Sequence, residues 1–83
     1  MRVKPDKTDL AILRAIERGP LRGAARVDVF TMEMRTFIPN STIRGRLGYL
    51  EHAKLITADR SRVPIDWRIT DAGRRALKEK VDA

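Results

Sequence analysis

The first apolar stripe at helical spacing lies near the start of the chain and consists of Leu10, Leu13 and Ile16. Thr8 just before it is a suitable N-cap, and Gly19 followed by Pro20 is typical of a helix end. The pattern therefore predicts a helix from about residue 8 to residue 18. The polar segment 1–7 in front of it is expected to be frayed.

A second set of residues recurs at i, i+3, i+4 and i+7: Val27, Phe30, Thr31 and Met34. This spacing predicts that they share one face of a helix over about 24–35. The segment before it, 21–23, is compatible with a loop or with a brief strand. Phe37 and Ile38 are expected to pack in the turn that follows, over about 36–40, which looks longer than that of a compact helix-turn-helix.

The third stripe, formed by Ile43, Leu47 and Leu50, predicts a helix over 40–53, capped by Asn40 or Ser41 after Pro39. Two strands are expected next, at 55–58 and 65–69, joined by the polar and basic loop 59–64. Alternation in the second strand directs Trp67 into the core and Asp66 and Arg68 to the opposite face. Thr70 is expected to cap a last helix over 70–81.

The order of elements is therefore helix, optional short strand, helix, helix, strand, strand, helix. It predicts an α+β fold, mainly α, with a three-helix core, a two- to three-stranded wing over 55–69 and a C-terminal helix. A chain of 83 residues is long enough for one modest core, so we expect one domain over 1–83.

Charge adds a candidate partner to this picture. The chain carries 18 Lys and Arg against 11 Asp and Glu, a net charge of +7, which is common in domains that bind polyanions. With no cysteine, no signal-peptide pattern and no apolar run near the roughly 18 residues that span a bilayer, a cytoplasmic protein without membrane contact is expected. No catalytic motif is visible, and His52 has no second metal-ligating partner, so we expect no enzyme activity, cofactor or metal.

Two runs carry a family resemblance. Residues 41–56 (STIRGRLGYLEHAKLI) are similar to the S-T-V-x-x-x-L-x-x-L-E-x-x-G-L-I run of bacterial winged-helix regulators of the MarR and PadR families. Residues 67–77 (WRITDAGRRAL) resemble their Y-x-L-T-x-x-G-x-x-x-L run. The resemblance implies a winged helix-turn-helix fold with 40–53 as the recognition helix. Lys54 stands where the family run has Gly, so the junction between helix and strand is expected to differ somewhat.

The position of each residue on the predicted recognition helix follows from about 100° per residue. Gly45 and Gly48 fall opposite the buried stripe, where the absence of side chains would let the helix approach a partner closely. Arg44 lies on one flank, and Arg46 and Tyr49 lie on the other. The candidate DNA contacts on this helix and on the wing loop are Asn40, Ser41, Thr42, Arg44, Gly45, Arg46, Tyr49, Arg60, Ser61 and Arg62.

These features predict a protein that binds double-stranded DNA, as a small bacterial or phage transcriptional regulator, a repressor or an activator. Helix 40–53 would enter the major groove, and loop 59–64 would follow the backbone or the minor groove. A homodimer is expected because operators are usually read as two half-sites. The alternative is a winged helix that binds another protein, such as a phage protein that occupies a host surface.

Overall fold

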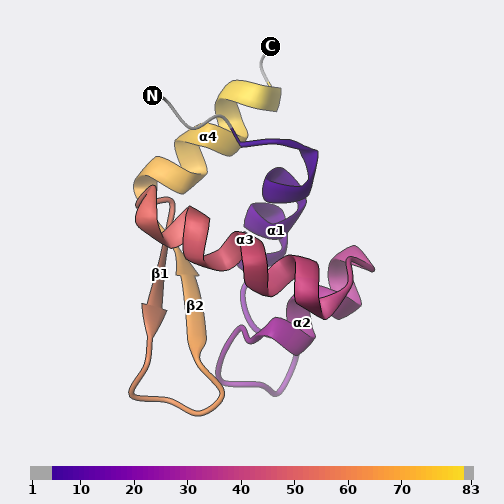
Figure 1. Cartoon of the computed structure of the whole chain (residues 1–83). Coiled ribbons are helices and arrows are strands. Elements are labelled where there is room, and N and C mark those ends of the chain that lie inside the picture. The colour runs from indigo at the N-terminus through magenta and orange to yellow at the C-terminus, as the bar shows by residue number, and fades with distance from the viewer. Residues whose placement is uncertain (1–4, 82–83) are drawn as a thin grey trace.

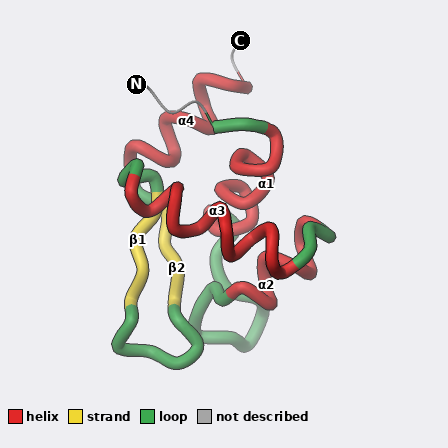
Figure 2. Tube along the Cα trace, viewed as in Figure 1, coloured by secondary structure: helices red, strands yellow, loops and turns green. Residues whose placement is uncertain are grey.

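The computed structural model describes residues 5–81. Its elements are α1 (Lys7–Glu17), α2 (Val29–Thr36), α3 (Asn40–His52), β1 (Ile56–Asp59), β2 (Asp66–Ile69) and α4 (Asp71–Val81). Figure 1 shows α3 running across the middle of the molecule in front of α1, with α4 above it and the hairpin projecting on the side away from α4. Within the described part of the chain, helices outweigh strands, which confirms the predicted mainly helical α+β class (Figure 2).

Helix α1 begins at Lys7, one residue before the predicted cap. Asp6, not Thr8, is the N-cap, because its carboxylate accepts a 2.9 Å hydrogen bond from the backbone N–H of Asp9. The Asp9 carboxylate accepts the N–H of Asp6 in return at 3.1 Å, which completes a capping box. Asp6 and Lys7 thus belong to the start of the helix and not to a frayed segment, while residues 1–4 lie outside the described residues. The predicted helix end at Gly19 is confirmed, and this glycine adopts the left-handed conformation, with φ +79°.

Helix α2 begins at Val29, and the prediction that it starts near residue 24 is wrong. Asp28 defines this start, because its side chain accepts hydrogen bonds from both the N–H and the hydroxyl of Thr31. Val27 precedes the helix as the buried residue of a largely exposed loop, where its carbonyl accepts a 2.9 Å bond from the N–H of Trp67. The hairpin is thus two-stranded within residues 5–81, with this one backbone bond continuing it on the far side of β2.

The later start also changes the face that α2 presents to the core. Met32 and Thr31 are buried, whereas Phe30 and Met34 are 63% and 49% exposed. The prediction that Val27, Phe30, Thr31 and Met34 share one helical face is therefore wrong. Spacing alone placed Val27 on the same helix as these residues, but Val27 reaches the core from the loop.

The turn between α2 and α3 has three residues, 37–39, so the expectation of a longer link is wrong. Phe37 does not pack in the turn: it is 90% exposed and left-handed, at φ +60°. Helix α3 starts at Asn40 behind Pro39, and no side chain caps its N-terminus, so neither Asn40 nor Ser41 serves as the predicted cap.

In the antiparallel hairpin, Ile56 pairs with Ile69 and Asp59 pairs with Asp66. Trp67 is buried, as predicted, but Asp66 is buried too, at 3% exposure, which contradicts its expected solvent-facing position. The loop at Val27 covers that side of β2, and the Val27 N–H donates a 3.0 Å hydrogen bond to the Asp66 carboxylate. Burial raises the pKa of Asp66, but this bond and the nearby Arg68 outweigh it and hold the pKa below its usual range.

The end of α3 is closed by two backbone bonds, from Lys54 N–H to the Glu51 carbonyl and from Leu55 N–H to the Leu50 carbonyl. Lys54 adopts φ +65°, the conformation that glycine favours, at the position where the family run has Gly. Thr70 caps α4 as predicted, by accepting a 3.0 Å bond from the N–H of Gly73. A side chain at Gly73 would meet the Leu55 carbonyl, so this glycine allows α4 to pack closely on the α3–β1 junction.

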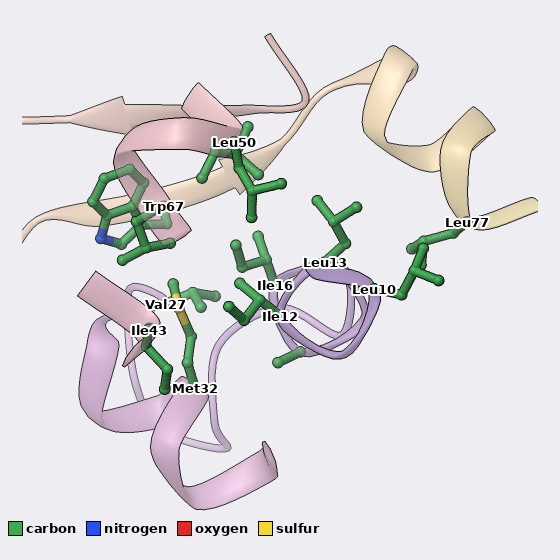
Figure 3. Close-up of a cluster of buried hydrophobic side chains, with 13 residues drawn as sticks. Leu10, Ile12, Leu13, Ile16, Val27, Met32, Ile43, Leu50, Trp67 and Leu77 are labelled. Atoms are coloured by element: carbon green, nitrogen blue, oxygen red, sulfur yellow. The ribbon is translucent and has the colours of Figure 1, made fainter. Parts of the chain in front are cut away.

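The core lies between α1, α2, α3 and β2, with α4 closing one end (Figure 3). Figure 3 shows Leu77 of α4 facing Leu10 of α1, while Trp67 of β2 lies near Val27 and Ile43. The predicted inward residues of α3, Ile43, Leu47 and Leu50, are all buried, which fixes which face of α3 is left for a partner.

Candidate nucleic-acid interface

The outer face of α3 carries only small residues up to Gly48. Ser41, Gly45 and Gly48 are exposed opposite the buried stripe, Thr42 is exposed on one flank of this face, and the exposed His52 follows on the same face at the end of the helix. A Cβ atom built at Gly45 or Gly48 would meet no heavy atom within 4 Å. Internal packing therefore does not explain either glycine, although each costs a helix interior about 1 kcal/mol relative to Ala. The structure places Ser41, Thr42, Gly45 and Gly48 together on one open strip.

One flank of this strip is fixed to α1. Arg46 donates two 2.7 Å hydrogen bonds to the carboxylate of Asp9, whose side chain is fully buried. The hydrogen bonds to Asp9 also raise the pKa of Arg46. The guanidinium lies 4.3 Å from the centre of the Tyr49 ring, which is itself partly exposed. In the free protein Arg46 thus joins α1 to α3, and its predicted DNA contact would compete with this bond.

The other flank of the strip faces α2. Asn40 accepts a 2.6 Å hydrogen bond from Nε of Arg44 and donates one of 2.6 Å to Glu33. This chain of polar contacts holds Arg44 along the helix. Among residues 5–81, Arg44 forms no ion pair, so its guanidinium nitrogens Nη1 and Nη2 remain available to an acceptor.

The wing is joined to α3 by a second arginine–carboxylate pair. Arg60 donates two 2.6 Å hydrogen bonds to Glu51, near the end of α3. The hydrogen bond from Arg60 holds the pKa of Glu51 below its usual range. The side chain of Arg60 is 59% exposed and lies 5.9 Å from the Trp67 ring centre. Sequence reasoning missed Glu51, because nothing in the local pattern links it to a residue nine positions away.

The wing loop carries its own acidic partner. Asp59 accepts hydrogen bonds from the hydroxyl and the N–H of Ser61, and these bonds lower its pKa. Arg62 lies 3.4 Å from the same carboxylate in an exposed ion pair. Arg26, which sequence reasoning also missed, donates a 2.7 Å hydrogen bond to the carbonyl of Val63 and ties the loop to the α1–α2 link. Ser61 and Arg62 are thus exposed, but they are held in a defined loop.

A groove of about 870 Å³ separates the wing from α2 and α3. Its charged lining consists of three arginines, Arg44, Arg60 and Arg62, and three carboxylates, Asp28, Glu33 and Glu51. The rest is largely apolar, including Phe30, Val63 and Trp67. The structure therefore brings Arg44 of α3 together with Arg60 and Arg62 of the wing, as predicted candidates for DNA contact. The groove that they line is balanced in charge and is not purely basic.

Across residues 5–81, no group of three or more histidine or carboxylate side chains could hold a metal ion. No helix in this range is long and apolar enough to cross a membrane.

Comparisons with known proteins place the fold. No protein-family model and no curated protein sequence matches the chain. The structure of BpsR from Bordetella bronchiseptica, a protein whose DNA binding is regulated by 6-hydroxynicotinic acid, is similar with a TM-score of 0.79 and 23% sequence identity. The similarity covers 95% of this chain and 55% of BpsR, so the chain spans about half the length of that protein. This chain therefore has the winged helix-turn-helix fold that the resemblance of its two sequence runs implied.

Proposed function

We propose that this protein binds double-stranded DNA and acts as a transcriptional regulator. The observation that carries the proposal is the open strip on α3, where Gly45 and Gly48 have no packing role and leave the helix surface bare. A helix in the major groove lies against base edges, so a bare surface permits close approach. The BpsR structure supports the proposal, because it places the same fold in a DNA-binding protein.

The groups around the strip have suitable roles. Arg44 can donate two hydrogen bonds to a guanine, and Ser41 and Thr42 can donate to phosphates. Arg60 and Arg62 on the wing would contact the backbone or the minor groove. The three carboxylates of the groove oppose this binding, and the net charge of +7 over the whole chain offsets them. Repression, activation and dimer formation remain further proposals.

The proposal is tested by adding methyl groups to the bare strip. Gly45→Ala and Gly48→Ala should each stabilise the fold by about 1 kcal/mol, because alanine is the better helix former and the space is empty. The double variant should nevertheless bind random duplex DNA more weakly than the wild type. Affinity is measured by fluorescence anisotropy and stability by urea denaturation. Equal DNA affinity together with higher stability would show that the glycines serve no partner.

Charge contacts are tested separately. Arg44→Ala should weaken binding and, if Arg44 reads a guanine, relax the sequence preference found by selection from random duplexes. Lys78→Ala removes an exposed cation from α4, away from the strip, and serves as the matched control. Wild-type affinity should fall with salt at a log–log slope of about −0.9 per phosphate contacted. No binding at low salt would refute the proposal and favour a protein partner.

A further inference from the structure

Three large apolar side chains are exposed on α2 and in the turn that follows it. Phe30 and Met34 lie one turn apart on α2 and are 63% and 49% exposed, and Phe37, directly after the helix, is 90% exposed. We call these three residues the α2 stripe. Met32 is buried on the opposite side of α2, so none of the three contributes to the core. Exposed apolar side chains that gather in one patch are typical of a contact site.

Phe37 adds a second, independent observation. Its backbone is left-handed at φ +60°, a conformation that bulky residues disfavour and that Gly or Asn would adopt with less strain. Its side chain contributes nothing to the core, because 90% of it is exposed. Neither the backbone nor the packing of this chain therefore explains a phenylalanine here.

We propose that the α2 stripe is the contact between neighbouring copies of this protein bound side by side on DNA. This inference rests on the proposed function. The charged residues of α2 are already engaged within the fold: Glu33 accepts from Asn40, and Arg35 donates to the carbonyls of Ala15 and Gly19. The stripe thus offers only apolar contact, and an identical stripe in a second copy is complementary to it under two-fold symmetry.

The size of the stripe explains why the contact needs DNA. An aromatic side chain carries about 150–250 Å², so the three partly exposed residues present on the order of 400 Å². A stable free interface buries about 800 Å² per partner. In addition, two copies at +7 repel each other in solution, whereas bound phosphates neutralise this charge.

The stripe also lies where neighbouring copies would meet. Phe30 lines the groove beside α3 and the wing. Phe37 lies in the three-residue turn that leads directly into α3. The stripe thus runs along the edge of the proposed DNA-binding surface and not on the far side of the molecule.

The test compares two duplexes of mixed sequence, one of about 12 bp and one of about 36 bp, near one and three helical turns. The wild type should bind the long duplex cooperatively, so that one bound copy raises the affinity of the next copy by a factor of about 5 to 150. Met34→Gln/Phe37→Asn should reduce this factor to about 1, and asparagine tolerates the left-handed position. Met34→Leu/Phe37→Leu keeps the stripe apolar and should retain cooperativity. All three proteins should bind the short duplex equally.

The outcomes separate the two proposals. If the wild type binds the short duplex but shows no cooperativity on the long one, the α2 stripe is not a contact between copies. DNA binding itself would then still stand. Cooperativity that survives in the Gln/Asn variant also overturns it, and assigns the stripe to another partner. Absence of binding to both duplexes refutes DNA binding itself.

Discussion

Two arginine–carboxylate pairs hold α3 in place, one on each side. Arg46 reaches Asp9 of α1, and Arg60 of the wing reaches Glu51; both pairs are bidentate. They differ in burial, mainly at the carboxylate: the Asp9 side chain is fully buried and its partner Arg46 is 31% exposed, whereas Glu51 is 29% exposed and Arg60 is 59% exposed. The comparison shows that the same chemical unit can stabilise a fold at one place and remain available for exchange at another.

Burial determines this difference. Removing one partner of a buried pair leaves a charge without compensation in a poorly solvated site, which costs several kcal/mol. Water solvates both partners of an exposed pair, so the pair contributes little to stability. Arg60 can therefore leave Glu51 for a phosphate at small cost, whereas Arg46 is held on α1.

The largest expected effect is at the buried pair. Arg46→Met should lower the free energy of unfolding by about 3 kcal/mol, because Asp9 then remains buried without a counter-charge. Urea denaturation followed by circular dichroism measures the loss. Arg44→Met, on the same helix but without an ion pair among residues 5–81, is the control and should cost no more than about 0.5 kcal/mol. Equal losses for both variants would show that the burial of Asp9 does not determine how much Arg46 contributes to stability.

A medium effect is expected at the exposed pair. Glu51→Gln should strengthen duplex binding by about fivefold, because it frees Arg60 and removes a negative charge from the groove. Stability should change by no more than about 0.5 kcal/mol. Glu79→Gln, an exposed acid on α4, is the matched control for net charge. If Glu79→Gln strengthens binding equally, net charge and not the wing contact sets the affinity.

The smallest effect is the titration of Glu51. Its folded-state pKa lies below the usual 4.5, so the contribution of the pair is complete above that pH and is lost as the pH falls through the folded value. Carboxyl carbon NMR should detect this lowered pKa. Arg60→Ala should return it towards 4.5. The pKa of Asp59 is lowered chiefly by its hydrogen bonds with Ser61, so it should stay low in Arg60→Ala and serves as an internal control. If the pKa of Glu51 is the same in Arg60→Ala as in the wild type, the pair does not form in solution.

Local patterns in the sequence were sufficient for much of the fold. The buried stripe of α3, the helix end at Gly19, the Thr70 cap and the position of Trp67 were all predicted, because each depends on residues that are close together in the sequence. The bare outer strip at Gly45 and Gly48 followed from the same periodicity. Within the candidate site, the sequence thus predicted that Gly45 and Gly48 lie on the exposed face of α3.

Other features depend on contacts between distant positions. Arg46 and Asp9 are 37 residues apart, and Asp66 meets Val27 across 39 residues, so no local pattern links them. Periodicity also placed Val27 on one helical face with Phe30, Thr31 and Met34, whereas the hydrogen bonds of Val27 with Asp66 and Trp67 keep it in the loop before α2.

By itself, then, the sequence determined the order of the elements and the orientation of α3, since the buried stripe of a helix is set by residues close together in the sequence. Only the tertiary structure decided which arginines are engaged and which remain available. That outcome depends on the burial of each carboxylate partner, and burial is set by elements that are far apart along the chain.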